Sequence, residues 1–265
     1  MPNEQAINLN ADLGESFGAW TMGDDQALLE VIASANLACG FHAGDPLVMR
    51  RTLRLAHQRG VSIGAHPSYP DLQGFGRRAM NMAAEDLEAA IIYQIGALAA
   101  LAGAEAATVS HVKVHGALSN SACADPLVAN TVCRATVAVD PALILLAPVL
   151  SQLAVAGREA GLRVIEEVFA DRAYLDDGQL VPRSRPDAMI HGADASLAHV
   201  RRMLEDGAIT SVSGKRLPLR VESICVHGDG AAAVATARAL RQGLTELGYK
   251  ILPLPALPLL ADSPR

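Results

Sequence analysis

The sequence predicts one α/β domain, spanning residues 1–265, in which parallel strands close into a barrel. Three observations support this fold class. Apolar runs of strand length alternate with helical patterns along the chain, no dinucleotide-binding glycine turn follows the first run, and several runs end in ionisable side chains. Strand–helix–strand repeats build parallel sheets, and barrels of this class have about 250 residues. We therefore expect a TIM-like (β/α) barrel with about seven parallel strands.

Seven apolar runs have the length of strands. In chain order they are Ile7–Asp12, Asn36–Gly40, Val61–His66, Val109–His115, Ala142–Ala147, Leu162–Val168 and Ser223–His227. Segments with apolar residues at helical spacing follow these runs. They are Asp24–Ser34, Pro46–Arg59, Ala84–Ala102, Pro126–Ala138, Pro148–Ala160, Ala195–Asp206 and Ala231–Leu247. The order of the segments indicates successive βα units.

Local signals refine this pattern. Asp45-Pro46 and Asp125-Pro126 each place a carboxylate before a proline, which predicts an N-cap followed by the first helical residue. The polar segment 169–194 is rich in turn residues, and we expect a long loop there, of the kind that forms lids or binding surfaces. Gly214-Lys215 predicts the turn of a short hairpin further along the chain.

Composition excludes several classes of function. The formal net charge of −6 argues against nucleic-acid binding, which needs concentrated lysine and arginine. The first six residues lack the profile of a signal peptide, and the apolar runs are too short or too interrupted to span a membrane. We expect a cytoplasmic protein. Its cysteines show no metal-binding spacing and should be reduced there; they are Cys39, Cys123, Cys133 and Cys225.

The strands that end in ionisable residues have one apolar face and one polar or small face. In the first run, apolar residues at positions 7, 9 and 11 alternate with Asn8, Asn10 and Asp12. Because side chains alternate across a strand, the polar face of each run should line the barrel interior. Barrel enzymes place their active sites at the C-terminal ends of the strands. We expect these residues to converge there: Asp12, His42, His66, His115, His227 and Asp229, with Lys113 just below.

Six motifs resemble those of a known family. They are NLNADLGESFG at 8–18, SANLACGFHAGDP at 34–46, GAHPSYPDLQGFGRR at 64–78, HVKVHGALSN at 111–120, FADRAY at 169–174 and SICVHG at 223–228. In this order they are similar to the LamB/YcsF family, whose members are understood as the A component of prokaryotic ATP-dependent 5-oxoprolinase. The sequence departs from the family pattern, which usually has Cys, Pro, Tyr and Thr, at Ala11, Val114, Ser119 and Gly230. The last two departures could alter substrate contacts.

The resemblance implies a hydrolase that acts on a cyclic amide, opening 5-oxo-L-proline (pyroglutamate) to L-glutamate with ATP hydrolysis. It implies ATP with Mg²⁺ as cosubstrate, and 5-oxoprolinase subunits B and C as partners. It also implies a barrel similar to those of glycoside hydrolases and carbohydrate deacetylases. The chain contains no GxxxxGK[ST] loop, since its one Gly-Lys pair, Gly214-Lys215, precedes Arg216. Much of the ATP binding should therefore come from the partner subunits.

The ionisable residues suit the opening of an activated lactam. Asp12 or Glu15 is the candidate general base, because crowding among carboxylates can raise a pKa towards neutrality. Lys113 offers a fixed cation for developing negative charge. Asp229 aligns with His227 but is also placed to cap a helix. The histidines that could relay protons or bind leaving groups are His42, His66, His115 and His227.

A second group of residues is expected to bind the substrate. Arg77 or Arg78 could hold a carboxylate or phosphate through two parallel hydrogen bonds. Tyr69 and Phe75 could wall the pocket, and Asn10 shares the polar face of the first strand with Asp12.

Two other functions remain open on sequence alone. Asp12, His42 and His66 could bind a divalent metal at the barrel rim, as in a metal-dependent deacetylase-like hydrolase. Alternatively, the chain could be a non-catalytic subunit that binds a small acid and serves its partners. The number of titratable groups at the rim favours catalysis.

Overall fold

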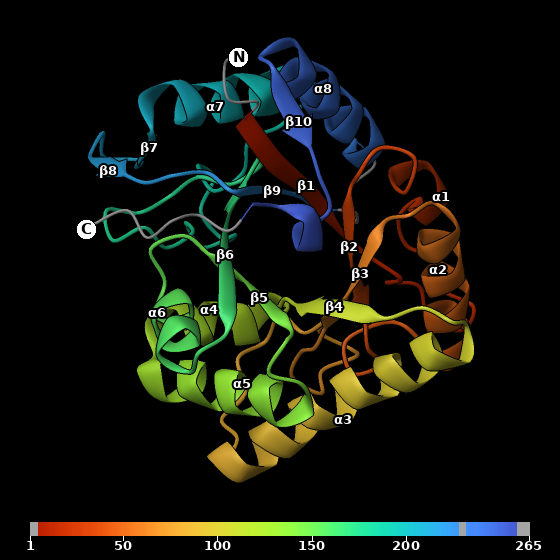
Figure 1. Ribbon diagram of the computed structural model, residues 1–265. Coiled ribbons are helices and arrows are strands. Elements are labelled where there is room, and N and C mark those ends of the chain that lie inside the picture. Colours follow the sequence, from red (N-terminus) through yellow and green to blue (C-terminus); the bar gives the residue numbers. More distant parts are fainter. Residues whose placement is uncertain (1–4, 228–231, 259–265) are drawn as a thin grey trace.

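The computed structural model describes residues 5–227 and 232–258, and within them the strands form a closed barrel surrounded by helices (Figure 1). The barrel strands pair side by side, all parallel, and β9 pairs with β1 to complete the ring. They are β1 (Gln5–Leu13), β2 (Ser34–Ala38), β3 (Ser62–His66), β4 (Val109–Val112), β5 (Ile144–Pro148), β6 (Arg163–Phe169) and β9 (Ser223–Val226). The predicted barrel is confirmed.

Helices form the outer layer of the barrel (Figure 1). They are α1 (Asp25–Leu28), α2 (Pro46–Gln58), α3 (Ala84–Ala104), α4 (Gly116–Ala124), α5 (Pro126–Val139), α6 (Gln152–Glu159), α7 (Ala193–Asp206) and α8 (Ala233–Glu246). Both predicted caps are confirmed: Asp45 accepts from the backbone N–H groups of Leu47 and Val48, and Asp125 accepts from that of Leu127.

Several predicted boundaries were wrong, and one helix was not predicted. The helix expected over 148–160 begins at Gln152, because Pro148 is the last residue of β5, and the strand expected over 36–40 lies at Ser34–Ala38. The helix expected over 24–34 ends at Leu28, because the chain must already pair with β1: the Ala33 N–H donates to the Leu9 carbonyl at 2.9 Å. The strand expected over 109–115 ends at Val112. Helix α4, which follows, was missed because its small residues give it almost no apolar periodicity.

Two different strands pair with successive parts of β1. β10 (Tyr249–Ile251) pairs with Gln5–Ile7, and β9 pairs with the following residues of β1. The chain then turns into the short 3-10 helix η1 (Leu254–Ala256), which lies inside the ring of strands in Figure 1. Its residue Leu254 belongs to a small buried cluster, whose other members are Ile144, Leu146, Ile165 and Leu257. The C-terminal segment thus covers one end of the barrel.

The two faces of β1 point as predicted. Its residues Ile7, Leu9 and Ala11 are fully buried in the main hydrophobic core. Asn8, Asn10 and Asp12 point into the barrel, where they form a ladder of hydrogen bonds. Asn8 donates to the Ser34 hydroxyl at 2.8 Å, and the Asn36 amide donates to Asn10 and Asp12 at 2.8 and 2.9 Å. These hydrogen bonds fix the side chains below the site.

Two segments interrupt the βα repeat after β6. Residues 170–192 form a long loop that is held by isolated bridges such as Tyr174 with Leu180. The predicted hairpin is confirmed as β7 (Ala208–Thr210) paired antiparallel with β8 (Arg216–Pro218). All four cysteines lie in the described residues, and none is bridged to another.

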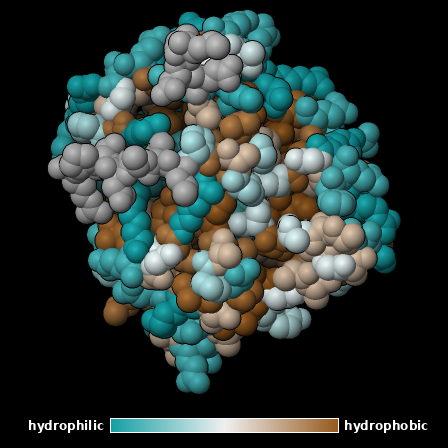
Figure 2. All heavy atoms as spheres, in the orientation of Figure 1, coloured by the Kyte–Doolittle hydropathy of each residue, from teal (hydrophilic) through white to brown (hydrophobic). Residues whose placement is uncertain are grey.

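Helix α3 is apolar and long enough, by length and composition, to cross a membrane. It instead packs one side against the barrel core through Leu87, Ile91, Ile95 and Leu98, while Tyr93 is 64% exposed on the other side. α3 is therefore a helix of the outer layer. The face drawn in Figure 2 has hydrophobic residues towards its middle and hydrophilic residues around its edge.

Candidate active site

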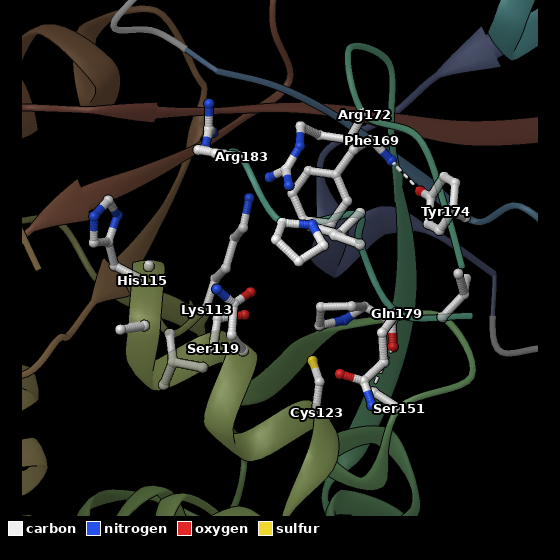
Figure 3. Close-up of a pocket in the computed structure, with 18 of the residues that line it drawn as sticks. Lys113, His115, Ser119, Cys123, Ser151, Phe169, Arg172, Tyr174, Gln179 and Arg183 are labelled. Carbon is white, nitrogen blue, oxygen red and sulfur yellow. Dashed lines mark hydrogen bonds between the residues drawn. The ribbon is translucent and has the colours of Figure 1, made fainter. Parts of the chain in front are cut away.

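A pocket of about 450 Å³ lies at the C-terminal ends of the strands (Figure 3). Asp12 and His66 reach it from the ends of β1 and β3, and Lys113, His115 and His227 follow directly after β4 and β9. The long loop after β6 forms the opposite wall. Figure 3 shows Arg172, Phe169 and Arg183 facing Lys113 and Ser119 across the pocket. This volume suits a small molecule.

Lys113 lies at the centre of a buried charged network. Its ammonium is 3.0 Å from Asp12 Oδ1, 3.2 Å from Glu167 Oε2 and 2.9 Å from the Cys225 sulfur. Burial by itself would lower the pKa of Lys113, but the carboxylates of Asp12 and Glu167 hold it well above its usual value. The lysine is therefore charged and already bound to two carboxylates.

The two carboxylates of this network behave differently. Burial would raise the pKa of Asp12, but His66 and Lys113 outweigh it and hold that pKa well below its ordinary value. The expectation that crowding raises the Asp12 pKa was therefore wrong. Burial does raise the pKa of Glu167, which Lys113 offsets only in part. Asp12 is thus a fixed anion at the pocket floor.

Three histidines gather beside this network. Nε2 of His66 is 3.0 Å from Nδ1 of His115, and the rings of His42 and His115 stack with their centroids 3.9 Å apart. Glu15 Oε1 lies 3.8 Å from nitrogen atoms of both His42 and His115. Burial lowers the pKa values of His42 and His115 well below the ordinary histidine value, so these rings are neutral at neutral pH.

His227 forms a separate pair on the loop side of the pocket. Its Nδ1 lies 2.9 Å from both carboxylate oxygens of Asp171, and its ring stacks on Phe169. The Arg183 guanidinium donates to Nε2 at 3.2 Å. Because a carboxylate accepts and a guanidinium donates, the ring carries its hydrogen on Nδ1 and presents a lone pair on Nε2. Such a nitrogen can accept a proton.

Arg172 brings a buried positive charge to the same wall. The side chain is 6% exposed, and one terminal nitrogen donates to the Val181 carbonyl at 2.6 Å. Its Nε has no hydrogen-bond partner in the described residues. Burial lowers the pKa of Arg172 to about 10, and the nearby Arg183 charge acts in the same direction. Arg172 is still a cation at neutral pH and can bind an anion in the pocket.

A model of the LamB/YcsF family matches residues 7–258. The chain belongs to the LamB/YcsF family. It is 60% identical, over 95% of its length and 98% of the relative's, to the A component of 5-oxoprolinase from Azoarcus sp. (strain BH72). It is 52% identical to an A component of 5-oxoprolinase from Bradyrhizobium diazoefficiens, over 94% of this chain and 98% of the relative. The resemblance stated on the motifs is thereby confirmed.

Solved structures agree with the barrel of this LamB/YcsF chain. The lactam utilization protein of Thermus thermophilus superposes with a TM-score of 0.88 at 41% identity, over 94% of this chain and all of that one. The catalytic domain of a peptidoglycan N-acetylglucosamine deacetylase from Eubacterium rectale gives a TM-score of 0.52 at 14% identity, over 100% of this chain and 92% of that one. The second likeness shows the fold alone.

Most of the predicted rim residues of the LamB/YcsF chain do meet. The pocket wall includes Asp12, His66, Lys113, His115 and His227. His42 and Glu15 lie behind it, against His115. Asp229 and Gly230 lie outside the described residues.

Two of the three predicted metal candidates lie against each other, and the third belongs to a neighbouring cluster. Nε2 of His66 is 3.4 Å from Asp12 Oδ2, and Lys113 is 3.0 Å from the other oxygen of the same carboxylate. The described residues whose ligand atoms all lie within 4.8 Å of one another are Glu15, His42, His66 and His115.

The residues predicted to bind substrate are more dispersed. Arg77 lines the pocket, and its guanidinium lies over the Phe75 ring. The backbone carbonyl of Phe75 is hydrogen-bonded to His115. Arg78 instead pairs with Asp71, with Nε 2.9 Å from Oδ1. Asn10 lies in the network below the pocket, where its amide donates to Glu167, and Tyr69 is buried. Of the departures from the family pattern, Ser119 and Val114 line the pocket.

Sequence reasoning missed Glu167, Asp171 and Arg172. Glu167 belongs to a strand that was predicted. Because side chains alternate along a strand, Glu167 shares a face with Phe169, and this could have placed it inside the barrel. Asp171 and Arg172 lie within the quoted motif at 169–174, but in a loop, where no periodicity indicates which way a side chain points.

Proposed function

We propose that this chain is the A component of an ATP-dependent 5-oxoprolinase, which hydrolyses 5-oxo-L-proline to L-glutamate together with partner subunits B and C in the cytoplasm. The observation that carries the proposal is the 60% identity, across nearly the whole of both chains, to a protein named as the A component of 5-oxoprolinase. The pocket supports it independently, because a small acid fits among cationic side chains.

ATP makes an otherwise unreactive amide open. A lactam resists attack by water because resonance stabilises it. Transfer of the terminal phosphoryl group of ATP to the carbonyl oxygen gives ADP and an activated ring carbon. Water then adds to that carbon, the carbon–nitrogen bond breaks, and the ring nitrogen takes up a proton, which leaves glutamate with its side-chain carboxyl group phosphorylated. A second water hydrolyses this acyl phosphate to glutamate and inorganic phosphate. The partner subunits supply much of the phosphoryl transfer, since this chain has no GxxxxGK[ST] loop.

In this proposal His227 carries the proton. Its Nε2 accepts from Arg183 in this structure, and it becomes free to act when Arg183 turns to the anionic substrate. It then takes a proton from the attacking water and returns it to the ring nitrogen as the carbon–nitrogen bond breaks. Asp171 holds the required tautomer and stabilises the imidazolium that forms between these steps. Asp12 and Glu15 were the expected bases, but Asp12 is held ionised by Lys113 and is a weak base. Lys113 thus orients Asp12, and the cation that stabilises negative charge on the substrate comes from other residues.

The substrate is positioned by its negative charge. 5-Oxoproline carries one carboxylate, and its activated form adds a phosphoryl group. Arg172 and Arg183 lie on one wall of the pocket, and Arg77 lies on its rim. Guanidinium groups bind both kinds of anion through paired hydrogen bonds. The buried Arg172 Nε suits this role, because it has no protein partner among the described residues.

Reconstitution tests the proposal directly. The purified chain is combined with subunits B and C, ATP, Mg²⁺ and 5-oxo-L-proline, and glutamate and phosphate are measured together. We expect both products in equal amounts, and none when this chain, a partner, ATP or the lactam is left out. Failure of the complete mixture to release glutamate would disprove the proposed reaction.

A further inference from the structure

Two buried histidines have ring nitrogens in direct contact. Nδ1 of His66 lies 2.7 Å from the Lys113 carbonyl oxygen, and Nε2 of His115 lies 2.9 Å from that of Phe75. A carbonyl oxygen only accepts, so in neutral rings both of these nitrogens carry the hydrogen. The remaining nitrogens, His66 Nε2 and His115 Nδ1, lie 3.0 Å apart, and His66 Nε2 also lies 3.4 Å from Asp12 Oδ2. Two such nitrogens attract a cation, which is either a proton on His66 beside Asp12 or a metal ion.

His42 adds a third nitrogen ligand to the same place. Its side chain is 1% exposed, and neither of its nitrogens has a hydrogen-bond partner in the described residues. Buried polar groups in native proteins nearly always have a partner, so each exception needs a physical explanation. The ring stacks on His115 and lies edge-on to His66, with centroids 3.9 and 5.6 Å away. His42 is thus buried without a hydrogen-bond partner among the described residues, and the nearest carboxylate oxygen printed for it, Glu15 Oε1, lies 3.8 Å from its Nε2.

Glu15 supplies the negative charge that a cation would need. Its Oε1 lies 3.8 Å from His42 Nε2 and 3.8 Å from His115 Nδ1, and the residue is 7% exposed. One ligand atom from each of the four residues lies within 4.8 Å of all the others. Metal–nitrogen bonds of about 2.0–2.1 Å separate the ligands of a tetrahedral ion by roughly 3.3 Å. To bind one ion, the four ligand atoms must move closer together. The His42 and His115 rings, which stack with their centroids 3.9 Å apart, must also turn so that both lone pairs point at the ion.

We propose that Glu15, His42, His66 and His115 form a binding site for one divalent transition-metal ion of the Zn²⁺ or Co²⁺ type. Three imidazoles and one carboxylate favour such ions over Mg²⁺ and Ca²⁺, which prefer oxygen ligands. His66 and His115 also line the pocket, so the site borders the proposed active site. The inference concerns binding only, and it stands whether or not the proposed reaction is correct.

Cobalt spectroscopy and metal analysis test the site in the full-length chain. The protein is freed of metal with a chelator, titrated with Co²⁺ while its visible absorption is followed, and then challenged with Zn²⁺. We expect the ligand-field bands of a nitrogen-rich site to reach saturation at one equivalent and to disappear on addition of Zn²⁺. Absence of saturable bands, together with no retained Zn²⁺ in elemental analysis, would overturn the proposal and favour a proton shared by the facing histidines.

Variants identify the ligands. His42→Phe removes two buried nitrogens that have no partner among the described residues, while preserving a flat ring against His115. We expect this variant to lose Co²⁺ binding and to unfold, without metal, at a temperature no lower than that of the parent chain. Glu15→Gln should weaken binding as well. His57→Gln, at an exposed position of α2, is the matched control and should bind normally.

The thermal data separate a ligand from a structural residue. Saturating Zn²⁺ should raise the unfolding temperature of the parent chain and of His57→Gln, but not that of His42→Phe, because binding to the folded state alone stabilises it. If His42→Phe instead bound Co²⁺ with unchanged bands, the proposed ligand set would be wrong.

Discussion

Asp171 holds His227 through both of its carboxylate oxygens, each 2.9 Å from Nδ1 of the ring. The two residues come from different elements, since Asp171 lies in the loop after β6 and His227 follows β9. His227 and neighbouring positive charges lower the pKa of Asp171 although burial opposes this, so the carboxylate stays ionised. The pair therefore fixes one tautomer of His227 and leaves Nε2 as the acceptor, which receives a hydrogen bond from Arg183.

Removing the charge of Asp171 should affect turnover more than substrate binding. In Asp171→Asn the amide can donate to Nδ1 and favour the other tautomer, which takes the lone pair away from Nε2. We expect glutamate release by the reconstituted complex to fall about 10²–10⁴-fold, with little change in the KM for 5-oxoproline. The control is Asp187→Asn, an exposed carboxylate of the same loop. Unchanged turnover in Asp171→Asn would eliminate His227 as the proton carrier.

Lys113 should be essential for stability because two buried carboxylates depend on it. Lys113→Met leaves Asp12 and Glu167 without their cation, and breaking a buried ion pair costs about 3–5 kcal/mol. We expect urea denaturation to show a loss of that size. Adding Glu167→Gln should recover part of it. Lys250→Met, at an exposed position of β10, should leave the free energy of unfolding within about 0.5 kcal/mol of the parent value.

Arg172 should determine affinity for the acidic substrate. Arg172→Gln removes the buried charge, and a hydrogen bond to a charged group contributes about 1.5–3 kcal/mol, so the KM for 5-oxoproline should rise at least about tenfold. Steady-state kinetics of the reconstituted complex measure this. Arg185→Gln, in the same loop and paired with Asp187, is the control. Arg78→Gln tests the alternative: a larger effect there than at Arg172 would return substrate binding to the 74–78 loop.

Gly64 should tolerate no side chain, because the His111 ring occupies the space beside it. A Cβ at this position would lie 2.2 Å from His111 Nε2, and that ring is held by Asn36 and Ser110. We expect Gly64→Ala to lower the free energy of unfolding by about 1–3 kcal/mol. Gly96→Ala is the matched control in helix α3, where nothing lies within 4 Å of the added carbon, and it should stabilise the chain by about 0.4–1 kcal/mol. Equal effects on denaturation would refute this packing account.

His199 should make the fold sensitive to mild acid. Burial lowers its pKa to about 4, and the Arg202 charge acts in the same direction, while the Arg172 carbonyl and Asp171 oppose them only in part. Histidine in an unfolded chain has a pKa of about 6.5, so the unfolded state takes up a proton first. The neutral ring stabilises the fold fully above pH 6.5, and this stabilisation is lost as the pH falls to about 4.

Denaturation at a series of pH values checks this expectation. The free energy of unfolding of the parent chain should fall more steeply between pH 6.5 and 4 than that of His199→Gln, because glutamine has no charge to gain. Parallel curves for the two proteins would show that another group controls the acid response.

The sequence was informative wherever a rule of short range applied. The alternation of residues 7–12 predicted which side chains of β1 enter the barrel, and Asp45 before Pro46 predicted a helix start. Local steric and hydrogen-bonding preferences suffice for both, because the residues concerned are neighbours along the chain.

Short-range rules failed where the chain met another element. Glu166 and Glu167 are identical neighbours in sequence but lie in different environments. Glu167 is fully buried and pairs with Lys113, whereas Glu166 lies outside the barrel and pairs with Arg158. Helix α4 was missed because its small residues carry no amphipathic signal.

The amino-acid sequence thus determined the repeated βα order, the inward polar faces and the set of ionisable residues at the strand ends. The tertiary structure alone decided what those residues do to one another. His66 receives its tautomer from a carbonyl 47 residues away, and His115 from one 40 residues away. Hydrogen-bonding roles and pKa values depend on distances of a few ångströms between distant segments, and those distances exist only once the barrel has closed.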